Sequence, residues 1–264
     1  MIPPKIANFE TYIVAYSGGK DSTATLLWAL DNLPRERVRA VFCDTGAEWP
    51  ETYDYLDYIE RELGIEIERI KAGDRKLPPK RDGTPPPIES TATSLWHLCQ
   101  LRGDWPKHRA RSCTTYLKWW PCRLLSYELD HPVILEGVRA EESKSRQQAG
   151  PGLHHNGATP VWRPVFYYTE KEIWDFLRAH HILPNPVYNH APRVGCWCCI
   201  MGRPREVLNF CRLHPDIAQV AADLEQEIDH TWQERHSITN LLRQAQAQIP
   251  LFEAQPRFKE VAKC

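Results

Sequence analysis

A short glycine-rich turn near the N-terminus constrains the fold of this chain more than any other feature. The turn Ser17-Gly18-Gly19-Lys20-Asp21-Ser22 follows an apolar, β-prone run over residues 12–16. Residues 21–33 come next, with leucines recurring on one helical face. Backbone N–H groups in such a turn can form an anion-binding nest, and the helix adds free N–H donors and a positive dipole end. The sequence therefore predicts a strand, a phosphate-binding turn and a helix.

The side chains of this turn suit the same task. Lys20 supplies a point charge, Asp21 can hold Mg²⁺ from the first helical turn, and the hydroxyls of Ser17 and Ser22 can donate hydrogen bonds. The turn is not the common P-loop, because its lysine is not followed by Ser or Thr, and it lacks the third glycine of the dinucleotide fingerprint. An ordinary tight turn between strand and helix is the alternative.

The rest of the N-terminal part predicts a doubly wound, parallel α/β sheet. Strands are expected over residues 38–43, 65–70 and 132–135, and helices over residues 51–63 and 169–180. Strands that alternate with helices form parallel sheets, which bind ligands at the carboxyl ends of their strands. Residues 17–19, 44–46 and 136–139 follow three of these ends and are polar or contain glycine.

The chain divides, in this interpretation, into a catalytic domain over residues 1–203 and a C-terminal helical extension over residues 204–264. The extension contains helical patterns and no strand pattern. Loops are expected over residues 72–87, which are rich in Pro and Lys, and over residues 147–159, which contain three glycines.

Composition excludes several classes of protein. Lys and Arg number 33 against 34 Asp and Glu, a formal net charge of −1, which excludes a global polycation but not a local basic face. No run approaches the ~20 apolar residues of a membrane span, and the N-terminus does not resemble a signal peptide. We therefore expect a cytoplasmic protein that does not enter a membrane. Nine cysteines, an odd number, favour thiol or metal chemistry over a disulfide framework.

Four segments, taken in order, resemble one enzyme superfamily. The turn at residues 17–22 resembles the pyrophosphate loop of the ATP pyrophosphatases, the adenine-nucleotide α-hydrolase-like superfamily. Residues 42–52, 136–146 and 184–188 resemble the Asp-Thr-Gly, Gly-x-Arg-x-x-Glu and Asn-Pro-Leu-Tyr segments of its phosphoadenylyl-sulfate reductase family. The resemblance runs from about residue 10 to residue 202 and implies a Rossmann-like fold. It also implies that the loop binds the β- and γ-phosphates of ATP, so that attack falls on the α-phosphorus.

The resemblance implies a nucleotide site as well. Lys20, Asp21 and Arg139 would be catalytic, and ATP with Mg²⁺ would be bound by Ser17, Gly18, Gly19, Lys20, Asp21, Ser22, Asp44 and Gly137. A forked guanidinium such as Arg139 can bind sulfate or phosphate, or it can pair with Glu141 or Glu142 at the surface. Asp44 can contact a ribose or a metal, or it can form an Asx turn before Gly46.

The cysteines point to a metal centre. Cys196 and Cys199 form a C-x-x-C motif, which alone can be a redox pair or half of a zinc site. The iron–sulfur reductases of the family combine such a motif with a Cys-Cys pair, and this chain has Ser112-Cys113 at that place. The resemblance therefore implies a [4Fe–4S] cluster on Cys113, Cys196 and Cys199. The candidates for a fourth ligand are Cys122 and Cys198, with Cys211 further off. Alternatively one iron is open to hold sulfur, as in some tRNA-thiolating enzymes of the superfamily; zinc and inert buried thiols are further alternatives.

Residues 102–123 form a basic and aromatic stretch. Six basic residues and one acid, a net charge of +5, alternate there with Trp and Tyr. The basic residues are Arg102, Lys107, Arg109, Arg111, Lys118 and Arg123. Positive charge combined with aromatic rings is typical of a nucleic-acid groove, although a nucleotide pocket with buried Trp explains it as well. The histidine pairs 154–155 and 180–181 are interpreted as surface or capping residues.

Together these features predict an ATP pyrophosphatase that adenylylates an acceptor for sulfur insertion, similar to the enzyme of DNA phosphorothioation systems. The implied partners are ATP, a nucleic acid with DNA favoured, and a cysteine desulfurase as sulfur donor; a homo-oligomer is left open. The alternatives are a sulfonucleotide reductase that makes sulfite, an RNA thiolase of the same superfamily, and a non-catalytic nucleotide-binding regulator. Thiol-dependent reductases of the family share a C-terminal Glu-Cys-Gly-x-His motif, whereas this chain ends at Cys264 without it.

Overall fold

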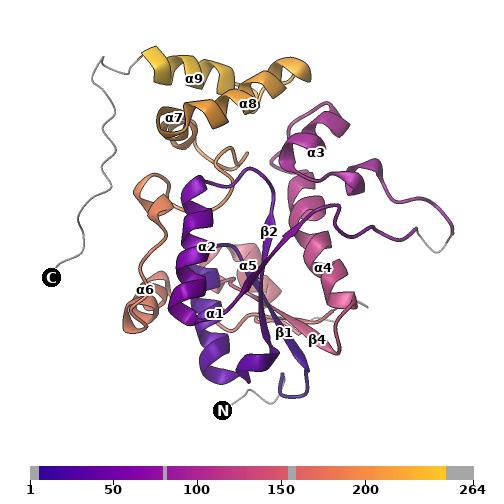
Figure 1. Cartoon of the computed structure of the whole chain (residues 1–264), viewed down its shortest axis with the longest axis vertical. Coiled ribbons are helices and arrows are strands. Elements are labelled where there is room, and N and C mark those ends of the chain that lie inside the picture. The colour runs from indigo at the N-terminus through magenta and orange to yellow at the C-terminus, as the bar shows by residue number, and fades with distance from the viewer. Residues whose placement is uncertain (1–5, 80–81, 154–158, 248–264) are drawn as a thin grey trace.

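A computed structural model describes residues 6–79, 82–153 and 159–247, and its centre is a five-stranded parallel sheet (Figure 1). The strands are β1 (Thr11–Tyr16), β2 (Val38–Asp44), β3 (Ile67–Lys71), β4 (Pro132–Glu136) and β5 (Val161–Trp162). Their order is β3-β2-β1-β4-β5, and every pairing is parallel. The chain builds outward from β1 to β3 and then returns to the other side of β1, so the switch point lies between β1 and β4. The predicted doubly wound α/β fold is confirmed.

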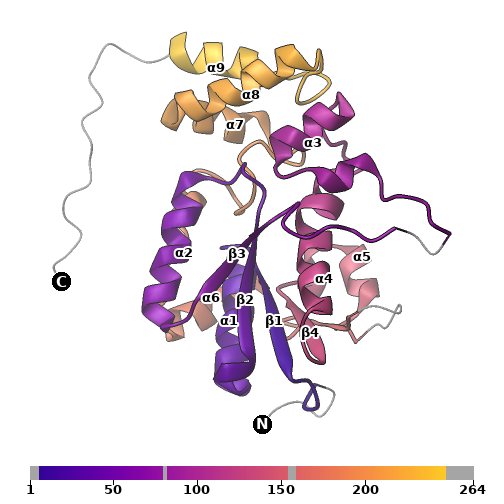
Figure 2. The same ribbon diagram turned by 45° about the vertical axis from the view of Figure 1, so that its right-hand side comes forward.

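Helices cover both faces of the sheet (Figures 1 and 2). One face carries α1 (Lys20–Asn32), α2 (Pro50–Leu63) and α6 (Glu170–Ala179), and the other carries α4 (Trp120–Tyr127). Side chains of a strand alternate between the two faces. Tyr12 and Val14 therefore pack with the first set of helices, whereas Ile13 packs with Leu125 of α4. Burial on both faces explains why β1 is a continuous apolar run.

The predicted element boundaries hold to within two residues, with local exceptions. Helix α6 begins with a capping box, in which the Thr169 hydroxyl accepts from the Glu172 N–H and the Glu172 carboxylate accepts from the Thr169 N–H. The loop expected from residue 147 is wrong at its start. Helix α5 (Lys144–Ala149) fills that place, capped by the Ser143 hydroxyl. The two-residue β5 was not predicted, and the pair at residues 154–155 lies outside the described residues.

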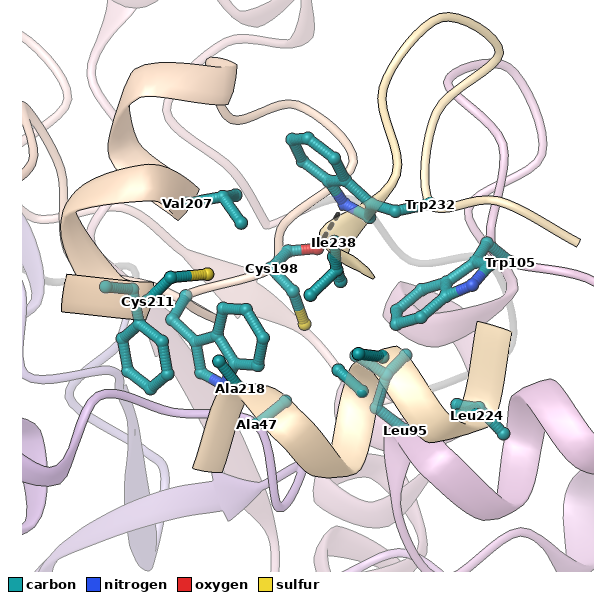
Figure 3. Close-up of a cluster of buried hydrophobic side chains, with 14 of the residues drawn as sticks. Ala47, Leu95, Trp105, Cys198, Val207, Cys211, Ala218, Leu224, Trp232 and Ile238 are labelled. Carbon is teal, nitrogen blue, oxygen red and sulfur yellow. Dashed lines mark hydrogen bonds between the residues drawn. The ribbon is translucent and has the colours of Figure 1, made fainter. Parts of the chain in front are cut away.

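A second apolar core lies beyond the carboxyl edge of the sheet, next to the C-terminal helices (Figures 1 and 2), and Figure 3 shows part of it. Its helices are α3 (Leu95–Arg102), α7 (Pro204–Leu213), α8 (Pro215–Glu227) and α9 (Ile238–Ala247). The Trp232 indole donates a 2.7 Å hydrogen bond to the Cys198 carbonyl, and the Cys198 side chain is buried in the same core. This core therefore anchors the C-x-x-C segment. This core contains residues from both sides of the predicted domain boundary between residues 203 and 204. The boundary itself stays a prediction.

None of the helices in the described ranges is long and apolar enough to cross a membrane.

Candidate functional site

The glycine-rich turn joins β1 to α1, as expected, and adopts a conformation that requires glycine. Gly18 has φ +73°, and a Cβ there would lie 3.2 Å from Thr52 Cγ2, so only glycine fits without strain. The Ser17 N–H donates to Ser22 Oγ over 3.2 Å, and the two serine hydroxyls lie 3.1 Å apart. Helix α1 has no side-chain cap at Gly19, which leaves the Asp21 and Ser22 N–H groups of its first turn for an anion.

A second turn, about 170 residues away in sequence, is hydrogen-bonded to this loop. The Asn185 amide, which is buried, donates to the Gly18 carbonyl over 3.1 Å. The Tyr188 hydroxyl accepts the Lys20 N–H over 2.9 Å. Neither residue is among the predicted site residues. The resemblance of the Asn-Pro-Val-Tyr segment to the family was the sequence signal that could have indicated them. These two hydrogen bonds join the glycine-rich turn to a turn that is distant in sequence.

Three predicted catalytic side chains meet at the start of α1. Arg139 Nε donates to Asp21 Oδ1 over 2.5 Å, and Lys20 Nζ lies 3.4 Å from Asp21 Oδ2. Arg139 also pairs with Glu141, which is the alternative considered for it, and its side chain is only 4% exposed. Burial alone would lower the pKa of Lys20, but Asp21, Tyr188 and Glu170 raise it above its ordinary value. The pair of cations therefore stays charged beside the loop.

Gly137 is placed against this cluster by the end of β4. A Cβ on Gly137 would lie 2.6 Å from the carbonyl group of Asp21. Contacts this short do not occur for real side chains, so the close approach of β4 to α1 requires glycine. The predicted site residue Gly137 thus sets the position of the first helical turn.

A cavity of about 290 Å³ opens at the carboxyl ends of β1, β2 and β4, and we call it the strand-end cavity. Ser17, Cys43 and Glu136 line it from the strand ends. Its other wall is a π-helical turn over Thr114–Trp119, closed by the hydrogen bond from the Trp120 N–H to the Thr115 carbonyl. π-Turns are frequent at functional sites because they re-aim side chains. This one places Lys118 and Trp119 on the cavity.

Asp44 is not among the residues that line this cavity. Its Oδ1 accepts hydrogen bonds from the Gly46 N–H over 2.8 Å and from the Tyr53 hydroxyl over 2.7 Å. The structure thus forms the Asx turn that was the alternative for this residue. Contact of Asp44 with a nucleotide stays a prediction.

A neighbouring cavity of about 200 Å³, which we call the cysteine cavity, is lined by Cys113, Cys196 and Cys199. The Arg193 guanidinium donates to Cys199 Sγ over 3.1 Å, and Arg111 lines the same space. Four residues line both cavities: Thr114, Lys118, Val194 and Gly195. The two cavities are therefore adjacent, with the Lys118 side chain between them.

A buried carboxylate lies at this junction. Glu48 accepts from the Thr45 hydroxyl over 2.7 Å and from the Cys196 thiol over 3.6 Å, and it lies 3.7 Å from Lys118 Nζ. Burial raises the pKa of Cys196 to about 12, and Glu48 acts in the same direction. Sequence reasoning missed Glu48, because only the folded chain brings it to the cysteines.

The fourth predicted cluster ligand, Cys122, is not with the other three. It packs with Ile13 and Val41 under α4, and it lines the strand-end cavity together with Cys43. Cys198, the other candidate, faces the C-terminal core (Figure 3). Within the described ranges, no three His, Cys, Asp or Glu side chains converge as ligands of a single metal ion.

The basic stretch is less uniformly positive than its sequence indicates. Arg102 pairs with Glu89 and Asp104, and Lys107 pairs with Asp104 as well. Arg123 is buried and lines the strand-end cavity. Exposed arginines remain around the cysteine segments at positions 109, 111, 193, 203 and 205. Arg102 and Lys107 are therefore paired with acids, and Arg123 is withdrawn from the surface.

Several known proteins are similar to this chain. Residues 11–201 match the model of the phosphoadenosine phosphosulfate reductase domain family. The chain is 33% identical over 253 residues to an uncharacterized 37.8 kDa protein of the gpa 5′ region of Escherichia phage 186, covering 79% of this chain and 73% of that protein. It is 26% identical to the adenosine 5′-phosphosulfate reductase of Allochromatium vinosum, over 69% of this chain and 64% of the reductase.

Two further relatives and one solved structure complete the comparison. The chain spans 35% and 44% of the lengths of two uncharacterized proteins of Methanocaldococcus jannaschii. The crystal structure of phosphoadenylyl-sulfate reductase from Candida auris aligns with a TM-score of 0.52 at 15% identity, over 74% of this chain and 85% of that one. At this identity the alignment shows a shared fold alone.

Proposed function

Because this chain belongs to the phosphoadenosine phosphosulfate reductase domain family, we propose that it is an ATP pyrophosphatase that adenylylates an acceptor for sulfur insertion. The observation that carries the proposal is the adjacency of two cavities. One lies at the phosphate loop and the strand ends, the other is lined by three thiols, and Lys118 borders both. A site that activates an acceptor with ATP and then delivers sulfur to it needs these two compartments side by side.

The residues at the loop suit the first half-reaction. An acceptor oxygen attacks the α-phosphorus of ATP, the bond to the bridging oxygen breaks, and pyrophosphate leaves with the electron pair. The first-turn N–H groups of α1, Lys20 and Arg139 supply positive charge where that leaving group develops negative charge. Mg²⁺ that arrives with ATP needs one or two carboxylates besides the phosphates, and Asp21 is the carboxylate at this position.

The cysteine cavity suits an iron–sulfur cluster held by Cys113, Cys196 and Cys199. The thiolates of such a cluster bind different irons, so its cysteines surround a space and do not converge on one ion. The three cysteines that line this cavity are arranged in that way. When bound, such a cluster would supply an iron to which sulfur can attach. In the second half-reaction sulfur attacks the adenylylated centre and AMP leaves with the acceptor oxygen. Arg193 and Lys118 provide the positive charge that favours an anionic sulfur species there.

DNA is the acceptor that we propose, with a cysteine desulfurase as sulfur donor. The exposed Arg111 lines the cysteine cavity, and the exposed Trp119 lines the strand-end cavity. Cations and an aromatic ring next to a reaction site are what a nucleic-acid backbone and its bases contact.

A sulfonucleotide reductase is the second candidate, and the similarity to adenosine 5′-phosphosulfate reductase favours it. Two assays separate the candidates. Anaerobically purified protein is incubated with ATP, DNA and sulfide, and pyrophosphate and AMP are measured; it is incubated separately with adenosine 5′-phosphosulfate and a thiol reductant, and sulfite is measured. Pyrophosphate release that requires DNA supports the proposal. Sulfite formation without pyrophosphate release refutes it, and replacing DNA with RNA tests the thiolase alternative.

A further inference from the structure

We infer that five exposed arginines around the cysteine cavity bind the phosphate backbone of a nucleic acid, independently of its base sequence. This inference rests on the proposed function, in which a nucleic acid is the acceptor, and it assigns the surface that holds that acceptor. We call these residues the arginine rim. They are Arg109, Arg111, Arg193, Arg203 and Arg205, and each of them is exposed.

The arginine rim is assembled from three segments of the chain that meet at the cysteine cavity. Arg111 and Arg193 line the cavity themselves. Arg203 and Arg205 lie at the start of α7, and the residues on both sides of this pair line the cavity. Arg109 is two residues before Arg111 in the segment that leads into the π-helical turn. Segments far apart in the sequence therefore bring positive charge to one opening.

The charge of the arginine rim is not balanced by acids of the same chain. Within the described ranges, none of its five arginines forms an ion pair with Asp or Glu. Exposed arginines elsewhere on the molecule do, since Arg146 pairs with Glu142 and Arg178 pairs with Asp175. The acid in the lining of the cysteine cavity is Glu206. Like charges that face one opening repel one another, and an anionic ligand bound there relieves this repulsion.

The make-up of the rim indicates a ligand with many phosphates along one chain. A guanidinium binds phosphate through two parallel N–H donors, which makes arginine the preferred partner of phosphate groups. Arg193 uses Nη2 for the Cys199 thiol, but a guanidinium has five N–H donors and keeps others for a phosphate.

A single triphosphate is too small a ligand for five arginines on three segments, and the glycine-rich turn is the site proposed for it. A nucleic-acid backbone carries a charge at every nucleotide and extends past the reacting group on both sides, so one strand reaches all three segments. Contacts to phosphates position a nucleic acid without reading its bases. The arginine rim therefore fits a backbone that is held across the cysteine cavity.

The test measures how salt weakens the binding of a fluorescently labelled DNA duplex to the anaerobically purified protein. Each phosphate contact contributes about −0.9 to the slope of log K against log salt, so five contacts predict a slope of about −4.5. Raising the salt from about 50 to about 200 mM should then weaken binding by the wild type roughly 500-fold. The triple variant Arg109→Gln/Arg203→Gln/Arg205→Gln should show a slope of about −1.8, a loss of roughly 12-fold over the same range.

Two controls accompany this measurement. Arg61→Gln changes an exposed arginine in the last turn of α2 and should keep the wild-type slope. A second duplex of different sequence should lose affinity in the triple variant as much as the first, because phosphate contacts do not depend on sequence. The iron content and Tm of the triple variant should match those of the wild type. If they do not, the three single variants replace it, and each should lower the steepness of the slope by about 0.9.

Several outcomes would overturn the arginine rim as a nucleic-acid surface. One is a wild-type slope in the triple variant, and the proposed function still stands in that case if pyrophosphate release from ATP requires DNA. Another is an equal change in Arg61→Gln, because the loss then reflects net charge alone. Poly-L-glutamate of matched charge tests an acidic protein as the partner. If it binds the wild type as tightly as the duplex does and loses affinity equally in the triple variant, the rim is not specific to nucleic acid. Absence of duplex binding by the wild type at low salt also overturns the rim, whereas pyrophosphate release without DNA separately refutes DNA as the acceptor.

Discussion

Replacing Gly137 with alanine should move the end of β4 away from the first turn of α1. The added Cβ would lie 2.6 Å from the Asp21 carbonyl and 2.7 Å from the Ser22 nitrogen, both backbone groups that cannot rotate away. Ordinary contact begins at 3.4 Å, so the two segments must separate by about 0.8 Å. Overpacking of this kind costs about 1–3 kcal/mol of stability. A displacement near 1 Å in a reaction site can cost about 100-fold in rate.

Two assays measure these effects for Gly137→Ala. Thermal unfolding should show a fall in Tm of about 2–4 °C for each kcal/mol lost. Pyrophosphate release from ATP should fall by about 100-fold, since Asp21 and the N–H groups beside it move together. Gly195→Ala is the control for stability, because a Cβ there meets nothing within 4 Å and its backbone is not left-handed. If Gly137→Ala unfolds at the wild-type temperature and releases pyrophosphate at the wild-type rate, β4 does not position the loop as argued.

Three further predictions concern the loop and the cysteines. Lys20→Ala should reduce pyrophosphate release at least about 100-fold, because it removes a cation from the leaving group, while Tm changes little; a wild-type rate would remove Lys20 from the site. Cys196→Ser should lose iron and acid-labile sulfide in anaerobically purified protein, whereas Cys122→Ser should keep both, and the reverse result would contradict the ligand set that the structure brings together. Ser112→Cys should keep its iron but lose the ability to bind added sulfide, because the new thiolate would occupy the free iron. The absorption spectrum of this variant should then stay unchanged when sulfide is added.

The sheet and the position of the glycine-rich turn between β1 and α1 could be predicted from the sequence because their signals are local. Apolar runs bounded by Gly and Asp mark β1, β2 and β4, and a turn of six specified residues marks the loop. The bracing by Asn185 and Tyr188 could not be predicted from spacing, since it joins turns about 170 residues apart in sequence. Only the likeness of the second turn to a known segment indicated that it matters.

The placement of Cys122 shows a case where more could have been predicted. Cys113 and Cys122 are nine residues apart, and residues 114–127 are helical. Nine residues make about two and a half turns of a regular α-helix, so the two side chains face nearly opposite directions. The π-helical turn at residues 114–119 could not be anticipated in this way, because one extra residue per turn leaves no periodic signal in so short a segment.

The number of thiols in the cysteine cavity bears on which reaction the site favours. A [4Fe–4S] cluster with four cysteines has a thiolate on every iron, whereas three cysteines leave one iron free for another sulfur ligand. Ser112 stands where the resemblance places the missing cysteine, and its hydroxyl is buried with no hydrogen-bond partner in the described ranges. A neutral hydroxyl is a poor ligand for iron beside soft thiolates. Lys118 and Arg193 line the same cavity with positive charge, and this arrangement supports the proposed sulfur insertion over the alternative reaction with four thiolates.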